Sequence, residues 1–240
     1  MNKEKTFSKY HQRGADYHWV WNGRNPLKMN AYIKARYKKC IELLDKIGNL
    51  DNKKVCDFGC GDGVLTYELF KKNLECYGID TSQEAIDFAK KKHKQLHSNS
   101  SFFVESCYET HFKDNFFDIV VSSDVIEHVT DQIKFLGEIN RILKPGGYAI
   151  ISTPVKVTKK PLDKNHVIEW FKDEYITLID KHFPNSQYFY SHPIFWYELI
   201  SYSTKWKWFV NLLSLIKDPF IAEGNWRFNT LQFSISKKPV

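Results

Sequence analysis

The sequence predicts an α/β fold in which a doubly wound, mostly parallel β-sheet carries helices on both faces. Two observations lead to this prediction. Short apolar runs typical of buried strands alternate with amphipathic helical patterns over residues 54–152. The first two runs are followed by glycine and by aspartate, as strands often are at the ligand-binding edge of such a sheet. We therefore expect a Rossmann-like core, preceded by an N-terminal helical arm and followed by an aromatic-rich C-terminal addition.

The first elements follow from apolar spacing and from capping residues. Residues 26–47 carry apolar side chains at near-helical offsets, and Gly48 is a suitable stop. The run at 54–58 is short, apolar and followed by glycines, which predicts a strand entering a tight turn. Thr81 or Ser82 can cap the helix after the second strand. The other elements of this half are a helix over 64–72, a strand over 75–79 and a helix over 82–93.

The alternation continues through the second half of the core and weakens after Pro154. The apolar run at 117–122 is typical of a strand buried on both faces. The aromatic segment between Tyr188 and Phe220 looks helical in part and contains no recognisable motif. The remaining elements are strands over 102–105 and 148–152, a helix over 131–143 ended by Lys144-Pro-Gly-Gly147, a loop over 156–165, a helix over 171–182 and a closing strand over 227–236.

Composition narrows the functional classes. The chain has 240 residues, a formal net charge of +7 and five cysteines without paired CxxC spacing, so neither a disulfide framework nor a structural zinc site is predicted. The polar N-terminus lacks a secretory apolar core, and no apolar run reaches the ~20 residues that span a bilayer. We therefore expect a cytoplasmic protein without membrane insertion. The lysine clusters are interpreted as solvated faces, because no nucleic-acid-binding motif accompanies them.

The strongest chemical signal is the glycine-rich turn after the first strand. Asp57 is followed by glycines at positions 59, 61 and 63, between a strand and a helix whose first N–H groups can meet a ligand. A dinucleotide fingerprint starting at Gly59 requires glycine at position 64, where Val64 stands. Asp57 can instead receive the ammonium group of an amino-acid ligand. Asp80 ends the second strand, where a carboxylate reaches ribose hydroxyls, although it can also cap the next helix.

These features resemble the class I S-adenosylmethionine-dependent methyltransferases, in particular the small-molecule group that includes ubiquinone-biosynthesis and sugar O-methyltransferases. The resemblance covers residues 53–154 and implies S-adenosylmethionine as cofactor, S-adenosylhomocysteine as product and a small-molecule acceptor. It rests on five pieces in the family's order: Asp57-x-Gly-x-Gly-x-Gly63, Gly78-Ile-Asp80, Asn115-Phe-Phe-Asp118-Ile-Val, Val125-Ile-Glu127-His128-Val and Leu143-Lys-Pro-Gly-Gly147.

The resemblance also implies which residues meet the cofactor. They are Asp57, Gly59 and Gly61 for the methionine part, Asp80 for the ribose, Thr81, Ser106 and Cys107 for the adenine, and Ser123 beside the transferring methyl group. Relatives often carry an aspartate after the third strand for the adenine amino group. Here Ser106 takes that place, and it offers a hydrogen bond without charge.

On the acceptor side, His128 is the candidate general base, because an imidazole with an ordinary pKa of ~6.5 can take a proton near neutral pH. Asp124, Glu127 and His128 form a D-x-x-E-H group, whose offsets place all three on one face if the segment is helical. In some relatives an E-x-x-E-H group at this place binds Mg²⁺. The alternative, which we favour, is that Glu127 and His128 form a structural and acceptor-facing pair without a metal.

Two further groups are assigned to the acceptor side. His166 precedes a predicted helix, and it either lines the acceptor pocket or caps that helix. Tyr17 and His18 belong to an aromatic group in the N-terminal arm. This group either folds over the cofactor as a lid or packs on the surface, and we favour the lid.

The predicted organisation is a lid and helix over 1–48, a cofactor-binding core over 49–154 and an acceptor-side cap with the closing strand over 155–240. We expect O-methylation of a small, phosphorylated or nucleotide-linked precursor of a cell-surface polysaccharide. Relatives with such aromatic additions modify capsule precursors, and the positive net charge suits an anionic acceptor. The alternatives are a quinone-type or N-methyltransferase and a non-catalytic cofactor-binding partner subunit, and the oligomeric state is left open.

Overall fold

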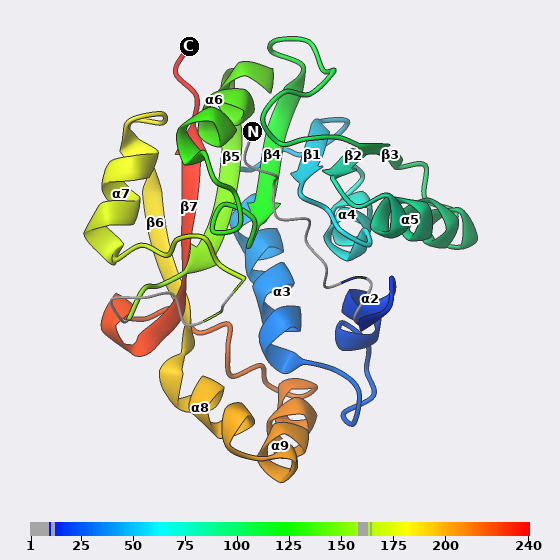
Figure 1. Cartoon of the computed structure of the whole chain (residues 1–240), viewed down its shortest axis with the longest axis vertical. Helices are drawn as coiled ribbons and strands as arrows, with labels where there is room; N and C mark the ends of the chain where they lie inside the picture. Colours follow the sequence, from blue (N-terminus) through cyan, green and yellow to red (C-terminus); the bar gives the residue numbers. More distant parts are fainter. Residues whose placement is uncertain (1–9, 11–12, 158–162, 164) are drawn as a thin grey trace.

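The computed structural model describes residue 10, residues 13–157, residue 163 and residues 165–240. The described residues form one seven-stranded sheet in the order β3-β2-β1-β4-β5-β7-β6 (Figure 1). The strands β1 to β5 pair in parallel, and β7 runs antiparallel between β5 and β6. The predicted doubly wound, mostly parallel sheet is therefore confirmed. The strands are β1 (Lys54–Phe58), β2 (Glu75–Asp80), β3 (Ser101–Val104), β4 (Phe117–Ser123), β5 (Leu143–Pro154), β6 (Gln187–Pro193) and β7 (Asn229–Lys237).

Helices cover both faces of this sheet, as the alternation of side chains along β4 shows. Ile119 and Val121 pack with α3 and α4, whereas Val120 between them points to the opposite face and packs with α6 and α7. The helices are α2 (Tyr17–Trp21), α3 (Ala31–Asp45), α4 (Val64–Phe70), α5 (Gln83–Gln95), α6 (Gln132–Ile142), α7 (Lys172–Asp180), α8 (Ile194–Tyr202) and α9 (Thr204–Ser214), with a 3₁₀ turn η1 (Trp226–Phe228).

Side-chain caps set the starts of the long helices. Asn30 accepts a hydrogen bond from the backbone N–H of Ile33 and opens α3, and Asp131 opens α6 in the same way. Ser82 accepts from the N–H of Ala85 at 3.2 Å and opens α5. Of the two caps considered for this helix, the structure uses Ser82.

The strand order reverses direction between β1 and β4. The chain leaves β1 toward β2 on one side, and it leaves β4 toward β5 on the other. In open α/β sheets, ligands bind at this reversal, outside the carboxyl ends of the strands. Gly59 follows β1 at this edge, and Asp124 follows β4.

The largest departure from the sequence analysis is β6. Its residues fall in the aromatic segment for which only partial helix was predicted, and the helical part of that segment forms α8 and α9. β6 is an edge strand that pairs with β7 alone, and most of its residues are half-buried. Its sequence consequently lacks the clear apolar alternation of a strand with one buried face.

The segment after β4 also differs from its prediction. Asp124 adopts a left-handed φ of 54°, and turns rather than a helix follow it as far as His128. The conditional placement of Asp124, Glu127 and His128 on one helical face is therefore wrong. β5 begins at Leu143 and includes the Pro-Gly-Gly segment that was expected only to end the preceding helix.

The predicted loop over 156–165 falls largely on residues 158–162 and 164, which lie outside the described part of the chain. Within the described part, no helix has both the length and the apolar character that crossing a membrane requires.

Candidate active site

The turn after β1 is built from backbone groups that converge on the end of β2. Gly59, Gly61 and Gly63 all have positive φ angles, of 86°, 53° and 81°, which side chains other than glycine rarely adopt. The carbonyl of Ile79 accepts hydrogen bonds from the N–H groups of both Gly59 and Cys60, at 2.9 and 2.8 Å. The turn is thereby fixed to β2, and Gly59 stays partly exposed where a ligand can approach, whereas Gly61 and Gly63 are buried.

Asp80 links the same turn to the next helix. Its carboxylate accepts from the N–H of Gly61 at 2.9 Å and from the N–H of Ser82 at 2.8 Å, and the residue stays partly exposed. Carboxylate oxygens accept more than one hydrogen bond each, so Asp80 can still receive hydroxyl groups. Thr81 next to it is exposed. This position suits ribose hydroxyls, the role that the resemblance implies.

Asp57 has a different environment. It is 2% exposed and accepts a hydrogen bond from the hydroxyl of Thr66 at 2.7 Å. Burial raises the pKa of Asp57 to about 7, with the hydrogen bond from Thr66 opposing that effect. Asp57 forms no ion pair with any described residue, so this buried carboxyl can receive an ammonium group, which would ionise it.

The described part of the N-terminal arm, residue 10 and residues 13–21, lies on this turn. The backbone N–H of His18 donates to the carboxylate of Asp62 at 3.0 Å, and the indole of Trp19 donates to the Asp62 carbonyl at 2.7 Å. A Cβ atom added to Gly61 would lie 1.8 Å from the hydroxyl oxygen of Tyr10. Tyr17 is buried, and its ring centroid lies 3.9 Å from that of His18, with the two rings tilted by 41°. The structure thus brings the two lid candidates to the cofactor turn.

The segment after β3 carries the residues expected beside adenine. Ser106 accepts a hydrogen bond from the N–H of Tyr108 at 3.3 Å, and both Ser106 and Cys107 are partly exposed. The Tyr108 hydroxyl in turn accepts from the N–H of Thr130 at 2.8 Å, in the turn before α6. The two candidate adenine neighbours therefore sit on a segment tied to the loop that follows β4.

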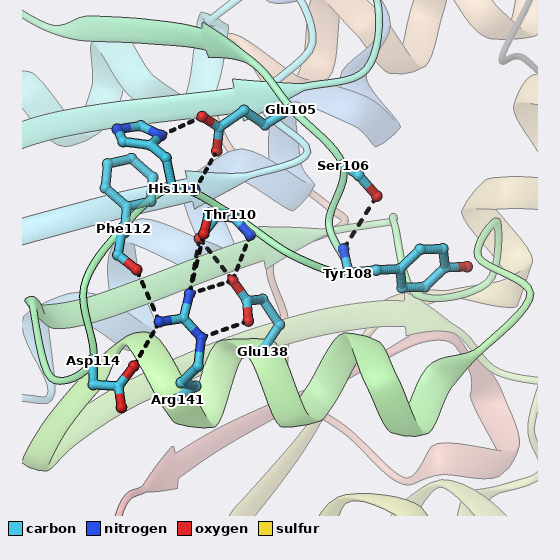
Figure 2. A network of polar contacts seen from close by, with 9 residues as sticks. All are labelled: Glu105, Ser106, Tyr108, Thr110, His111, Phe112, Asp114, Glu138 and Arg141. Atoms are coloured by element: carbon cyan, nitrogen blue, oxygen red, sulfur yellow. Dashed lines mark hydrogen bonds and ion pairs between the residues drawn. The ribbon is translucent and has the colours of Figure 1, made fainter.

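A polar network holds the same segment against α6 (Figure 2). Arg141 donates to both carboxylate oxygens of Glu138, and its other nitrogen donates to the Phe112 carbonyl at 2.8 Å. Glu138 also accepts from the N–H and the hydroxyl of Thr110, both at 2.7 Å. Burial opposes ionisation of Glu138, but these hydrogen bonds hold its pKa below the usual range. The network fixes the backbone on which Ser106 and Cys107 depend.

On the acceptor side, a buried cation reaches the turn after β4. Arg36 of α3 is 6% exposed and pairs with the carboxylate of Asp124. Asp124 also accepts from the hydroxyl of Ser152 at 3.2 Å, and that hydroxyl lies 3.1 Å from the hydroxyl of Ser123. Asp124 is thus held by Arg36 and β5, and Ser123 faces the same edge. The sequence analysis did not single out Arg36. The available signal was a charged side chain beside Ala35 on the apolar side of a helix.

Glu127 is fully buried. Its Oε2 accepts from the Thr153 hydroxyl at 3.1 Å, and its Oε1 has no hydrogen-bond partner among the described residues. Burial, and then the charge of Asp124, raise the pKa of Glu127 well above its usual range. Its carbonyl accepts from the N–H of Val167 at 2.8 Å, which ties the turn to the segment around His166.

His128 and His166 lie side by side, with ring centroids 4.9 Å apart. Nδ1 of His128 is 3.1 Å from the carbonyl of Asn165. A carbonyl only accepts, so Nδ1 carries the proton and Nε2 of the neutral ring is an acceptor. Nδ1 of His166 lies 2.5 Å from a carboxylate oxygen of the buried Glu169. The structure therefore brings together Glu127, His128 and His166, which sequence spacing alone did not group.

The ligand-type atoms of Glu127, His128 and His166 lie within 4.8 Å of one another. This set replaces Asp124, the first residue of the D-x-x-E-H group considered for Mg²⁺, with a second histidine. Two imidazoles and one carboxyl suit a softer ion than Mg²⁺, which prefers oxygen ligands. The residues present therefore do not fit the magnesium site of the relatives.

Comparison with known proteins shows the family to which the chain belongs. A family model described as a methyltransferase domain matches residues 49–208. The ubiquinone biosynthesis O-methyltransferase of Bradyrhizobium sp. (strain ORS 278) is 31% identical over 129 residues, which are 54% of this chain and 51% of that protein. Phosphoethanolamine N-methyltransferase 1 of Arabidopsis thaliana is 33% identical over 121 residues, or 50% of this chain and 25% of that protein. The chain thus matches half of the first relative's length and a quarter of the second's.

Among solved structures, phosphoethanolamine N-methyltransferase 2 of Haemonchus contortus in complex with S-adenosyl-L-methionine has a TM-score of 0.68 at 18% identity. The similarity covers 98% of this chain and 60% of that chain. At this identity the likeness shows a common fold.

The glycine turn leads to the first prediction. Alanine at position 61 must adopt a left-handed conformation, at a cost of about 1–3 kcal/mol, and displace Tyr10. We expect Gly61→Ala to weaken S-adenosylmethionine binding by about tenfold or more in isothermal titration calorimetry. Gly137→Ala is the matched control, because a Cβ there meets nothing within 4 Å, and it should keep the parent affinity. Equal affinities for both variants would contradict this account of the turn.

The second prediction concerns the pH dependence of cofactor binding. An Asp57 carboxyl with a pKa of about 7 is partly neutral near neutral pH and must lose its proton to pair with the cofactor's ammonium group. Affinity for S-adenosylmethionine should therefore strengthen as the pH rises from about 6 to about 7.5, with release of protons measurable by calorimetry in two buffers. Asp57→Asn should abolish this dependence. An affinity of the parent protein that does not vary over this range would refute the pairing.

Proposed function

We propose an acceptor for this chain, which belongs to the class I S-adenosylmethionine-dependent methyltransferases and uses S-adenosylmethionine as its cofactor. The acceptor is a hydroxyl group of a small, phosphorylated or nucleotide-linked precursor of a cell-surface polysaccharide. The observation that carries O-methylation is the hydrogen bond from His128 to the Asn165 carbonyl, which leaves Nε2 as a proton acceptor at the carboxyl edge of β4.

On the cofactor side, Tyr10 fills the space beside Gly61 and Val125 the space beside Gly59, so the cofactor would meet the turn at the partly exposed Gly59 and at Asp80. Asp57 would hold the ammonium group and Asp80 the ribose. When bound, S-adenosylmethionine supplies a methyl group on a sulfonium and leaves as S-adenosylhomocysteine. The arm residues that lie on the turn would exclude water from it.

On the acceptor side, Nε2 of His128 takes the proton that the acceptor hydroxyl gives up. Glu127, with its raised pKa, is a neutral acid that offers one O–H group to the acceptor or to a neighbouring ring. His166 is oriented by Glu169 and borders His128. The pair of imidazoles therefore provides one positioned base and one hydrogen-bonding partner. The net charge of +7 favours the approach of an anionic acceptor.

A second candidate is N-methylation of a phosphorylated amine. It is favoured by the similarity to proteins named phosphoethanolamine N-methyltransferase, in sequence and in fold. An amine that arrives neutral needs a base less than a hydroxyl does, so the role of His128 separates the two candidates.

The third prediction concerns which acceptors the enzyme methylates. Candidate acceptors are tested one at a time, and methyl transfer is measured as the release of S-adenosylhomocysteine. These acceptors are nucleotide-linked sugars, sugar phosphates, phosphoethanolamine and a catechol. We expect turnover with phosphorylated or nucleotide-linked hydroxyl compounds, and no loss of it in EDTA because Asp124 is paired with Arg36 and Glu127 is neutral. Turnover with phosphoethanolamine alone would establish the second candidate. Activity lost in EDTA and restored by a metal ion would overturn the metal-free site.

The fourth prediction concerns His128. His128→Ala should lower kcat by about 10²–10⁴, the usual contribution of a general base, because His128 is the base that we assign to the acceptor proton. The affinity for S-adenosylmethionine should stay unchanged, since His128 is not among the expected cofactor contacts, which lie at the ends of β1, β2 and β4 and after β3. His97→Asn, at an exposed position after α5, is the control and should keep the parent kcat. A His128→Ala enzyme that keeps most of its rate would show that the acceptor needs no base.

A further inference from the structure

Helix α9 exposes large apolar side chains on its outer face. Its inner face is buried against α3 and includes Val210, Asn211 and Ser214. A solvated helix of a soluble protein normally presents polar side chains on its outer face. Here the outer face and the residues just after it carry large apolar side chains that are 39–87% exposed: Trp206, Trp208, Phe209, Leu212, Leu215 and Ile216.

The orientation of α9 is fixed by the buried amide of Asn211. Its side-chain oxygen accepts from the N–H of Ala31 at 3.0 Å, and its nitrogen donates to the carbonyls of Pro26 and Met29, both at 2.8 Å. Rotating the helix to bury its outer face would leave these polar groups unpaired in an apolar environment, at a high cost. The outer face is therefore directed to solvent by the fold itself.

Three lysines on α9 or just after it are unpaired: Lys205, Lys207 and Lys217 form no ion pair with any residue in the described part of the chain. Asp218 pairs with Lys38, and Glu223 pairs with lysines of α3 and its end. Glu198 of the adjacent α8 is an exposed acid without an ion pair among the described residues, so the unpaired charge of α8 and α9 is basic on balance. Tryptophan and lysine on one face are the combination found in helices that lie in a membrane interface.

We propose that the outer face of α9 docks on the surface of an anionic lipid bilayer, with its axis in the plane of the interface and without crossing it. The apolar side chains enter the boundary between headgroups and acyl chains, and the lysines meet the lipid phosphates. A second copy of the chain is a poorer occupant, because a two-fold contact would bring the unpaired lysines of both copies together.

The position of α9 gives this docking a consequence. In Figure 1, α8 and α9 lie at the lower end of the molecule, toward which the arrowheads of β4 and β5 point. The carboxyl ends of the parallel strands carry the candidate active site. Docking therefore turns that side of the molecule toward the bilayer. This inference does not rest on the acceptor proposed above.

The test is flotation of the full chain with vesicles. One set contains equal parts of phosphatidylcholine and phosphatidylglycerol, and the other contains phosphatidylcholine alone. We expect binding to the anionic vesicles that weakens as salt is added, and much weaker binding to the neutral ones. The double variant Trp208→Ser/Ile216→Ser should lower the affinity for anionic vesicles by more than about tenfold. Lys205→Gln/Lys217→Gln should lower it and remove the salt dependence.

Ile133→Ser on α6 is the matched control, because Ile133 is an exposed apolar residue (55%) outside α9 and should leave vesicle binding unchanged. All variants should bind S-adenosylmethionine as the parent does, which shows that each is folded. Absence of binding to anionic vesicles, or binding that the α9 variants do not alter, would overturn the proposal. So would a dimer in ultracentrifugation without lipid that Trp208→Ser/Ile216→Ser dissociates, since the second copy would then be the occupant.

Discussion

The carbonyl of Ile79 is the point on which the cofactor side depends. It accepts two N–H groups from the turn after β1, and the neighbouring Asp80 carboxylate accepts a third. These bonds are available only because β1 and β2 are parallel and end at the same edge of the sheet. They help to hold Gly59 and Gly61 in left-handed conformations, which glycine adopts without strain. The turn after β1 and the end of β2 therefore form one connected unit. The arm then rests on that unit through Asp62.

The acceptor side is organised by buried charge rather than by backbone geometry. Arg36 crosses from α3 to Asp124, 88 residues away in the sequence, and burial, followed by the charge of Asp124, raises the pKa of Glu127 well above its usual range. Buried ion pairs contribute little net stability, because desolvation offsets their attraction, but they fix relative positions closely. The Arg36–Asp124 pair therefore sets where α3 lies against the end of β4. It also removes Asp124 from any metal site, which leaves His166 as the third neighbour of Glu127 and His128.

This division explains what the sequence could predict. The turn from Gly59 to Gly63 was predicted because its conformation depends on the glycines within it. Their spacing also excludes a dinucleotide-binding fingerprint. The parallel core was predicted because strands buried on both faces form unbroken apolar runs, as at 117–122. β6 was not, since an edge strand with half-buried residues lacks that signal. The helical arrangement of Asp124 and Glu127 was wrong because a hydrogen bond to Ser152, distant in sequence, favours a left-handed turn. Arg36 was missed for the same reason, because its partner lies on another element.

Helix α3 contacts both α9 and the turn after β4. Through this helix, the C-terminal addition can influence the position of residues in the candidate active site. The buried amide of Asn211 ties α9 to Ala31 at the first turn of α3, and Arg36 lies five residues further along the same helix. An α-helix rises 1.5 Å per residue, so these two contacts are separated by less than two turns of a rigid element. Any displacement of α9 against its surroundings must move α3 or break the bonds of Asn211. A shift of α3 would in turn move the guanidinium that holds Asp124. The outer surface of α9 and the turn that carries Glu127 and His128 are therefore connected through α3 alone over a short distance.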